Sequence, residues 1–227
     1  MKRIHLLTCF LLLFGVSCNN EDEEKSYRSC NGLLSNCAGS GEGAFCTFGF
    51  KWGSSNPFST AGLEVNGPSE AGGEITYRFY EKGEVFNTHA QVDLLSASFD
   101  QITICDPKDQ IRQVLLAWES EANLSFREVS GSTSGDLRFI VAHIQQGGVG
   151  YPAFTDDLCG TLAGQVVIGL PTRNTCEGFR NLVLHEIGHT LGLGHVSTDN
   201  VMNPGIQDIT ELMPGDIEGI QSIYGTR

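Results

Sequence analysis

Regular alternation of apolar and polar residues begins near residue 74 and predicts a β-sheet. Residues 74–80 place Ile75, Tyr77 and Phe79 on one side of an extended chain and polar residues on the other, as in a half-buried strand. The glycine-rich residues 147–150 predict an irregular loop. Further strands are predicted where β-rich stretches follow, at 124–129, 136–142 and 162–170.

A helical period follows the first strand. Asp106 suits an N-cap and Pro107 suits the first helical position, because proline lacks the N–H that this position leaves unused. Apolar residues then recur at i, i+3, i+4 and i+7, namely Ile111, Val114, Leu115 and Trp118. This spacing predicts an amphipathic helix with one buried face.

Two more helices are predicted toward the C-terminus. Asn174 is the expected N-cap of the first, with Glu177 three residues on, and Gly192 and Gly194 are expected to end it. Its core face consists of Leu182, Val183 and Ile187. The second spans 214–224, with Ile217, Ile220 and Tyr224 on one face. Together the elements predict an α+β domain over residues 71–227.

The composition of the chain limits the kinds of partner that it can bind. The chain has 227 residues, 40% of them hydrophobic, and a net charge of −13. This length suits one globular domain with additional segments. The acidic balance argues against nucleic acid as a partner, because phosphate binding needs a basic face.

The first residues predict export. Lys2 and Arg3 precede an apolar stretch at 4–16, which is too short to span a bilayer. Small residues before Cys18 and an acidic run after it resemble a bacterial lipoprotein signal, although Gly15 stands where leucine is usual. We interpret 1–17 as a signal peptide and 18–70 as an acylated tether and loop-rich segment. Cys18 would anchor the protein to an outer membrane or cell surface. An ordinary secretory signal with a chance cysteine is the alternative.

Export decides how the cysteines are interpreted. Apart from Cys9 and Cys18, the remaining cysteines are Cys30, Cys37, Cys46, Cys105, Cys159 and Cys176. An oxidising compartment predicts up to three disulfides among them. We expect Cys159 to pair with Cys176, because this bond would brace the loop that enters the second helix.

The strongest chemical signal lies in the sequence HEIGHTLGLGH at residues 185–195. His185 and His189 are four residues apart, so on a helix both imidazoles can reach one metal ion. A third ligand must come from outside the helix, and Gly192 lets the chain turn so that His195 returns to the metal. Three protein ligands leave a position for water, as in catalytic zinc sites. We therefore predict one catalytic Zn²⁺.

Glu186 is the predicted catalytic base. It follows His185 in sequence but projects at a different angle, toward the expected position of a water molecule. Zinc lowers the pKa of such a water, and a carboxylate within hydrogen-bonding reach can accept its proton and pass it to the leaving amine. The predicted reaction is metal-assisted hydrolysis of a peptide bond.

The extended motif resembles that of the metzincin zinc metalloproteases. Met202, seven residues after His195, resembles the methionine of their Met-turn, and residues 216–225 resemble the C-terminal helix of the matrixins. Weaker similarities lie at 75–78, 117–118 and 124–129. The resemblance covers 71–227 and implies a matrixin-like domain: a twisted mixed sheet, an active-site helix, a Met-turn and a C-terminal helix. It further implies a secreted, monomeric endopeptidase for protein or peptide substrates, with 162–168 in the edge-strand region that pairs with substrate.

Several residues depart from the matrixin pattern. Val196 follows the third histidine where serine is usual, Gly215 replaces the first acid of a pair, and Ile206 stands where a tyrosine is common. Ligands for a second, structural zinc are not evident, since His143 is isolated. Asp156 and Asp157 are candidate Ca²⁺ ligands, although a solvated loop explains them better.

Two other functions remain open at this stage. A surface lipoprotein could keep the zinc fold as an adhesin with little turnover, although Glu186 argues against this. A zinc hydrolase for a non-peptide amide or ester has the same motif.

Overall fold

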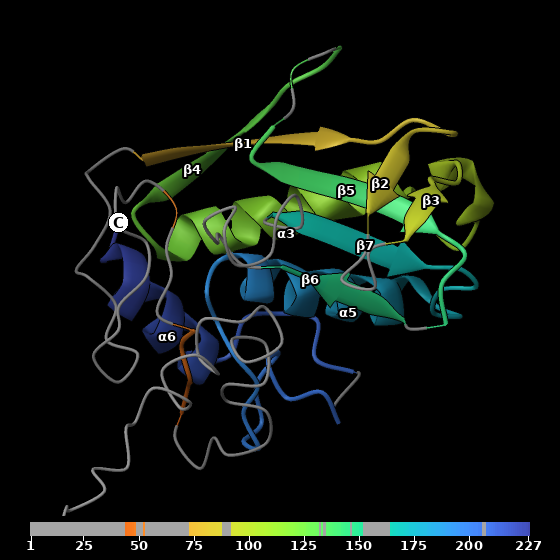
Figure 1. Ribbon diagram of the computed structural model, residues 1–227. Coiled ribbons are helices and arrows are strands. Elements are labelled where there is room, and N and C mark those ends of the chain that lie inside the picture. The colour runs from red at the N-terminus through yellow and green to blue at the C-terminus, as the bar shows by residue number, and fades with distance from the viewer. Residues whose placement is uncertain are drawn as a thin grey trace, which may run out of the picture.

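The computed structural model describes part of the chain, namely residues 44–48, 52, 73–87, 92–131, 133, 135–145, 147–151, 164–205 and 208–227 (Figure 1). The signal peptide, the Cys18 anchor and the candidate Ca²⁺ ligands Asp156 and Asp157 lie outside these residues. None of the helices in the described part has the length and apolar character of a membrane span.

The main sheet has the strand order β4-β1-β5-β7-β6. Pairing is parallel throughout except for β6, which runs antiparallel to β7. The mixed sheet and the helices confirm the predicted α+β class. The strands are β1 (Gly73–Phe79), β4 (Leu124–Glu128), β5 (Leu137–Ala142), β6 (Gly148–Gly150) and β7 (Gln165–Gly169).

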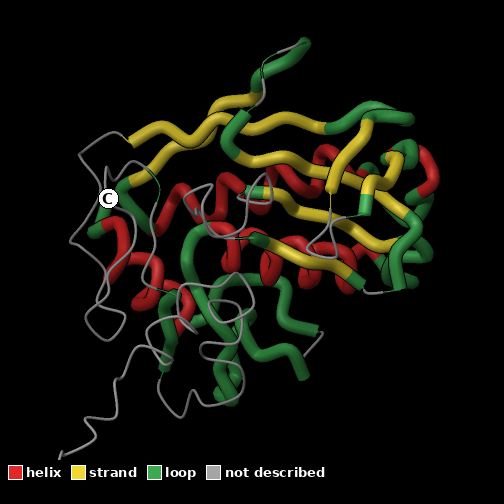
Figure 2. The backbone as a smooth tube through the Cα atoms, viewed as in Figure 1, coloured by secondary structure: helices red, strands yellow, loops and turns green. Residues whose placement is uncertain are grey.

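Strands β5 and β7 each contribute to two separate apolar clusters. On β5, Phe139 and Val141 belong to the main core, whereas Ile140 and Ala142 belong to a smaller cluster. This division follows from strand geometry, because successive side chains point to opposite faces. The helices cover the first face, as Figure 2 shows. The second face packs against Phe86 and Leu94 of a hairpin.

That hairpin was not predicted from the sequence. It consists of β2 (Val85–Asn87) and β3 (Asp93–Leu95), which pair antiparallel. A short 3-10 helix, η1 (Phe99–Gln101), follows and was also missed. These elements are too short to establish a clear period, and Val85 and Leu95 expose large apolar side chains to solvent.

The predicted helices are confirmed. Helix α3 (Pro107–Glu121) begins at the Asp106 N-cap and buries the predicted face, including Trp118. Helix α5 (Cys176–Thr190) is capped by Thr175 and not by Asn174, because the Thr175 hydroxyl accepts the Gly178 N–H. Helix α6 (Pro214–Tyr224) buries Ile220 and Tyr224 as predicted, but Ile223 is buried in place of Ile217.

The edge of the sheet next to α5 differs from the prediction. Residues 148–150 form strand β6 and not an irregular loop. β7 pairs with β5 on one side and β6 on the other. The predicted edge position is therefore wrong for the described residues 165–168, which lie inside the sheet, and β6 is the edge strand at this side.

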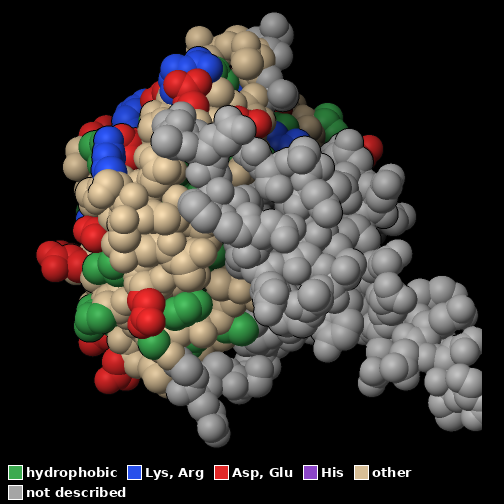
Figure 3. All heavy atoms as spheres, turned by 90° about the vertical axis from the view of Figure 1, so that its left-hand side faces the viewer, with side chains coloured by type: hydrophobic (Ala, Val, Ile, Leu, Met, Phe, Trp, Pro, Cys, Tyr) green, Lys and Arg blue, Asp and Glu red, His purple; other side chains and the backbone are tan. Residues whose placement is uncertain are grey.

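The opposite edge carries exposed ion pairs. Arg127 of β4 pairs with Glu74 of β1 at 2.8 Å, and Arg112 of α3 pairs with Glu128 of β4 at 2.8 Å. On the face drawn in Figure 3, basic side chains lie beside acidic ones and form no continuous patch among the residues coloured there. Exposed pairs of this kind contribute about 0–1 kcal/mol each, so packing of the core carries most of the stability.

Candidate metal centre

Helix α5 places His185 and His189 one above the other. Their Nε2 atoms are 3.0 Å apart. The Nδ1 atom of His185 is 2.8 Å from the carbonyl oxygen of Val201, and that of His189 is 2.8 Å from the carbonyl oxygen of Leu193. A carbonyl can only accept a hydrogen bond, so each Nδ1 must carry the hydrogen. Each Nε2 then presents a lone pair, which is the arrangement of metal-binding histidines.

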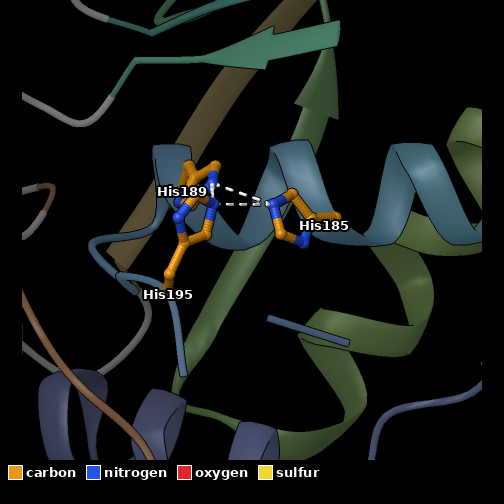
Figure 4. A group of neighbouring side chains, drawn as sticks. All are labelled: His185, His189 and His195. Carbon is orange, nitrogen blue, oxygen red and sulfur yellow. Dashed lines mark hydrogen bonds between the residues drawn. The ribbon is translucent and has the colours of Figure 1, made fainter. Parts of the chain in front are cut away.

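His195 completes the group from outside the helix. Gly192 adopts φ +108°, a left-handed conformation that side chains disfavour, and turns the chain back toward the helix. The His195 Nε2 atom lies 3.2 Å from that of His185 and 3.1 Å from that of His189 (Figure 4). The predicted role of Gly192 as a hinge is therefore confirmed.

The three nitrogen atoms fit a zinc ion. Tetrahedral zinc with Zn–N distances of about 2.0–2.1 Å holds its nitrogen ligands about 3.3 Å apart, close to the spacings above. Lone pairs facing one another at this distance repel unless a cation lies between them. Among the described residues, these histidines are the one group of three or more metal-ligating side chains that converge in this way.

Burial keeps the histidines in the metal-binding form. Desolvation lowers the pKa of His185 to about 4 and lowers the pKa of His189 and His195 as well. The positive charges of neighbouring histidines add to the effect at His185 and His189. Neutral imidazole is the form that binds metal, so the site is ready for a cation at neutral pH.

These shifts predict how the metal-free protein responds to acid. The pKa of His185 falls from 6.5 to about 4 on folding, so the unfolded chain binds a proton that the folded state excludes. Stability present above pH 6.5 should then be lost as the pH falls toward 4. Glu186 acts in the opposite direction, because its pKa is raised from 4.5 to about 8, but one carboxyl opposes three histidines.

The measurement is urea unfolding of zinc-free protein between pH 7 and pH 4, monitored by circular dichroism. Zinc-loaded protein at each pH is the control, because bound metal holds the histidines neutral. A free energy of unfolding that stays flat or rises across this range in the zinc-free protein would contradict the prediction.

Glu186 lies in the same cavity as the histidines. The cavity has a volume of about 390 Å³, and Glu186 is buried. Burial raises the pKa of Glu186 to about 8, although a hydrogen bond from the Gly150 N–H and the positive charge of Arg173 oppose the shift. A carboxyl group with a pKa near neutrality can both accept and return a proton, as a general base requires.

Strand β6 packs directly against α5 at Glu186. A Cβ atom at Gly150 would collide with the backbone carbonyl of Glu186, and one at Gly148 would lie 2.8 Å from its Oε1 atom. Only glycine permits this approach between the edge strand and α5. The glycine-rich stretch was the signal in the sequence for this contact. Glycines mark positions of close backbone approach as well as loops, and only the loop was predicted.

Met202 packs beneath the metal-binding helix. A Cβ atom at Gly188 would collide with its Sδ atom, so Gly188 gives the methionine its place against α5. The turn is held by Asp216, whose buried carboxylate accepts the N–H groups of Val201 at 2.9 Å, Met202 at 3.3 Å and Met213 at 2.9 Å. Although Gly215 replaces its neighbouring acid, Asp216 still fastens the predicted Met-turn to α6.

Removal of the Asp216 carboxylate is expected to destabilise the domain. Asp216→Ala would leave several buried N–H groups without an acceptor, each costing about 1–3 kcal/mol. We expect a fall of several degrees in Tm and weaker zinc binding, because Val201 also positions His185. Thermal unfolding with and without zinc is the measurement. Asp208→Ala, at an exposed aspartate, is the control, and equal Tm values for both variants would contradict the assigned role.

A segment before the sheet also reaches the site. Thr47 bridges to Leu193, and the Phe48 N–H donates to the Gly192 carbonyl at 2.8 Å. The Phe48 ring is buried, lies 5.8 Å from the His189 ring and lines the cavity. Trp52 donates from its indole nitrogen to the Thr190 carbonyl at 2.8 Å. No periodicity marked these residues, so their role was not predicted.

Further residues complete the description of the site. Asn181 lines the cavity and donates to the Ile209 carbonyl, and His143, noted above as isolated, is exposed. Ile206 is not among the described residues. Asn203 and Pro204 also line the cavity, as does Arg173, which was not predicted as a site residue.

The described cysteines answer part of the disulfide prediction. Cys46 is disulfide-bonded. Cys105 and Cys176 are free thiols, so the predicted Cys159–Cys176 bond is wrong for this structure.

Comparison with known proteins agrees with this geometry. The profile of the Matrixin family of peptidases matches residues 171–225, which include α5, His195, Met202 and α6. The chain contains a matrixin-like metzincin catalytic domain. It is 33% identical over 141 residues to the hatching enzyme of Paracentrotus lividus. The aligned region covers 53% of this chain and 23% of that protein.

Other relatives have similar coverage. Metalloendoproteinase 1-MMP of Arabidopsis thaliana is 30% identical over 148 residues, or 56% of this chain and 40% of the relative. Matrix metalloproteinase-19 of Mus musculus is 34% identical over 134 residues, or 52% and 25% respectively. The chain thus spans less than half the length of these relatives, and the similarity concerns the matrixin-like domain. Zinc is the metal that this similarity implies for His185, His189 and His195.

Proposed function

We propose that this chain is an exported zinc-dependent endopeptidase that hydrolyses peptide bonds of proteins, with Glu186 as general base. The observation that carries the proposal is the convergence of three histidine lone pairs in a cavity that also holds a buried carboxyl group. Similarity to proteins named as metalloproteinases supports the same reaction.

Each residue has a defined task in this proposal. His185, His189 and His195 hold the zinc ion, which when bound lowers the pKa of a water molecule and polarises a carbonyl group. Glu186 accepts a proton from the water and returns it to the leaving amine. The hydrogen bond from the Gly150 N–H helps to orient the Glu186 carboxyl, and the burial of Glu186 limits its contact with bulk solvent.

The edge strand gives the substrate class its support. β6 uses one edge to pair with β7, and Gly147–Gly150 line the cavity. An extended polypeptide can add to such an edge through backbone hydrogen bonds. This favours a protein or peptide segment over a small amide or ester. Glu186 in the cavity favours catalysis over a zinc-binding adhesin, because mere binding does not need a base.

The test is cleavage of an unfolded protein by the purified chain. We expect cleavage that stops with a zinc chelator and returns when zinc is restored. A small-molecule ester and amide serve as comparison substrates. Binding of the unfolded protein without cleavage would favour the adhesin, and turnover of the small substrates alone would favour a non-peptide hydrolase.

Lipid attachment is a separate prediction about localisation. If Cys18 becomes the acylated N-terminus, metabolic labelling with a fatty-acid analogue should mark the wild-type protein, and Cys18→Ser should abolish the label and release protein from the membrane fraction. Cys9→Ser is the matched control, since Cys9 lies within the expected signal peptide. Unlabelled, freely soluble wild-type protein would indicate an ordinary secretory signal.

A further inference from the structure

Two cysteines lie at the beginnings of the helices that pack behind the sheet. Cys105 immediately precedes the Asp106 N-cap of α3, and Cys176 is the first residue of α5. The Cys176 thiol lies close enough to Cys105 to raise the pKa of its thiol. Both residues are partly exposed, so an oxidant could reach them.

The two cysteines are close because α3 and α5 pack against each other. α3 and α5 run side by side along one face of the sheet and share the main core (Figure 1). Cys105 itself packs against that core. Because apolar side chains of the main core fix the two helices against each other, the cysteines at the starts of the helices stay close together.

Other uses of the pair are poorly supported. A structural metal site needs additional ligands, and neither cysteine belongs to a metal-ligating group among the residues that the structure describes. A redox catalyst needs a readily formed thiolate, whereas burial and the adjacent Cys176 thiol raise the pKa of Cys105 to about 12. A structural role therefore fits the pair better than a catalytic one.

We propose that Cys105 and Cys176 form a disulfide that ties the start of the active-site helix α5 to the start of α3. The two thiols lose two protons and two electrons as the sulfur–sulfur bond forms. A disulfide oxidant, either a small molecule or a protein of the export pathway, accepts them and is reduced to two thiols. The bond would fix the start of α5 to α3, three residues after Arg173, which lines the cavity.

The expected effect is on stability, independently of catalysis. The bond closes a long stretch of chain that contains β4, β5, β6 and β7. Cross-links across long loops restrict the unfolded chain strongly. We expect the oxidised protein to have a Tm about 5 °C or more above that of the reduced protein.

Full-length protein equilibrated with oxidised glutathione and then digested provides the direct test. Mass spectrometry should identify a linked pair of peptides containing Cys105 and Cys176, which reduction separates. This measurement uses the wild-type chain and does not depend on whether a variant folds. Alkylation of both thiols after equilibration, or a link from Cys176 to Cys159, would overturn the proposal.

Variants locate the stability effect. Oxidation should raise the Tm of the wild-type protein partly through this bond. Cys105→Ser and Cys176→Ser should each abolish that part of the rise. Comparison of oxidised and reduced samples of the double variant shows how much the remaining cysteines, including the disulfide-bonded Cys46, contribute. An undiminished rise in the double variant would assign the whole effect to other cysteines and contradict the proposal.

Discussion

Glu186→Ala is expected to lower kcat by about 10²–10⁴-fold, the usual contribution of general acid–base catalysis. The zinc content should remain stoichiometric, because the three histidines and the carbonyl groups that orient two of them are unchanged. Cleavage of an unfolded protein and metal analysis of the same sample are the measurements. Activity within tenfold of wild type would refute the role of Glu186 as base.

A matched control lies on the same helix. Glu177 is in the first turn of α5 and is exposed, so Glu177→Ala removes a carboxylate without affecting the cavity. We expect this variant to keep near wild-type activity. Loss of activity in both variants would indicate a general effect on α5.

Glu186→Gln separates catalysis from stability. The pKa of Glu186 is raised from 4.5 to about 8 because burial disfavours its charged form. A raised pKa means that stability present below pH 4.5 is lost as the pH rises toward 8. Glutamine has no carboxyl group to ionise, so the metal-free variant should lack this loss. An inactive variant that is more stable than wild type at pH 8 would indicate that the carboxyl is kept for chemistry at a cost in stability.

The sequence predicted the convergence of the three histidines because their geometry is local. A spacing of four residues fixes two histidines on one side of a helix, and Gly192 marks the turn that returns His195. Helix α3 was predicted for a similar reason, since its cap and its apolar period both lie within one short segment. Such features need no knowledge of the rest of the fold.

The missed features depend on distant contacts. Strand β6 has glycine at two of its positions, so no alternation of side chains marks it, and its reason lies in the backbone of Glu186. Phe48 reaches His189 through pairing with residues far along the chain. The proximity of Cys105 to Cys176 likewise follows from the packing of α3 on α5. Six cysteines permit fifteen pairings, and only the tertiary structure distinguishes among them.

His195→Ala is expected to abolish both stoichiometric zinc and activity. The variant keeps the pair on α5, but two imidazoles with a 3.0 Å separation leave the ion half coordinated by water. Loss of an outer-shell partner already lowers metal affinity by about 10–100-fold, and loss of a direct ligand should cost more. The chain should still fold, because Leu193 and Val196 remain buried on either side of the substituted residue.

Zinc-dependent stabilisation distinguishes loss of the ligand from loss of the fold. A ligand that binds only the folded state at a hundred times its Kd stabilises it by about 2.7 kcal/mol, so the wild-type Tm should rise when zinc is added. His195→Ala should show the metal-free Tm and little response to zinc. His143→Ala, at an exposed histidine away from the cavity, should respond as wild type does. Full zinc occupancy in His195→Ala would mean that the third ligand lies elsewhere, because two helical histidines alone do not retain a stoichiometric ion in a site that needs three protein ligands.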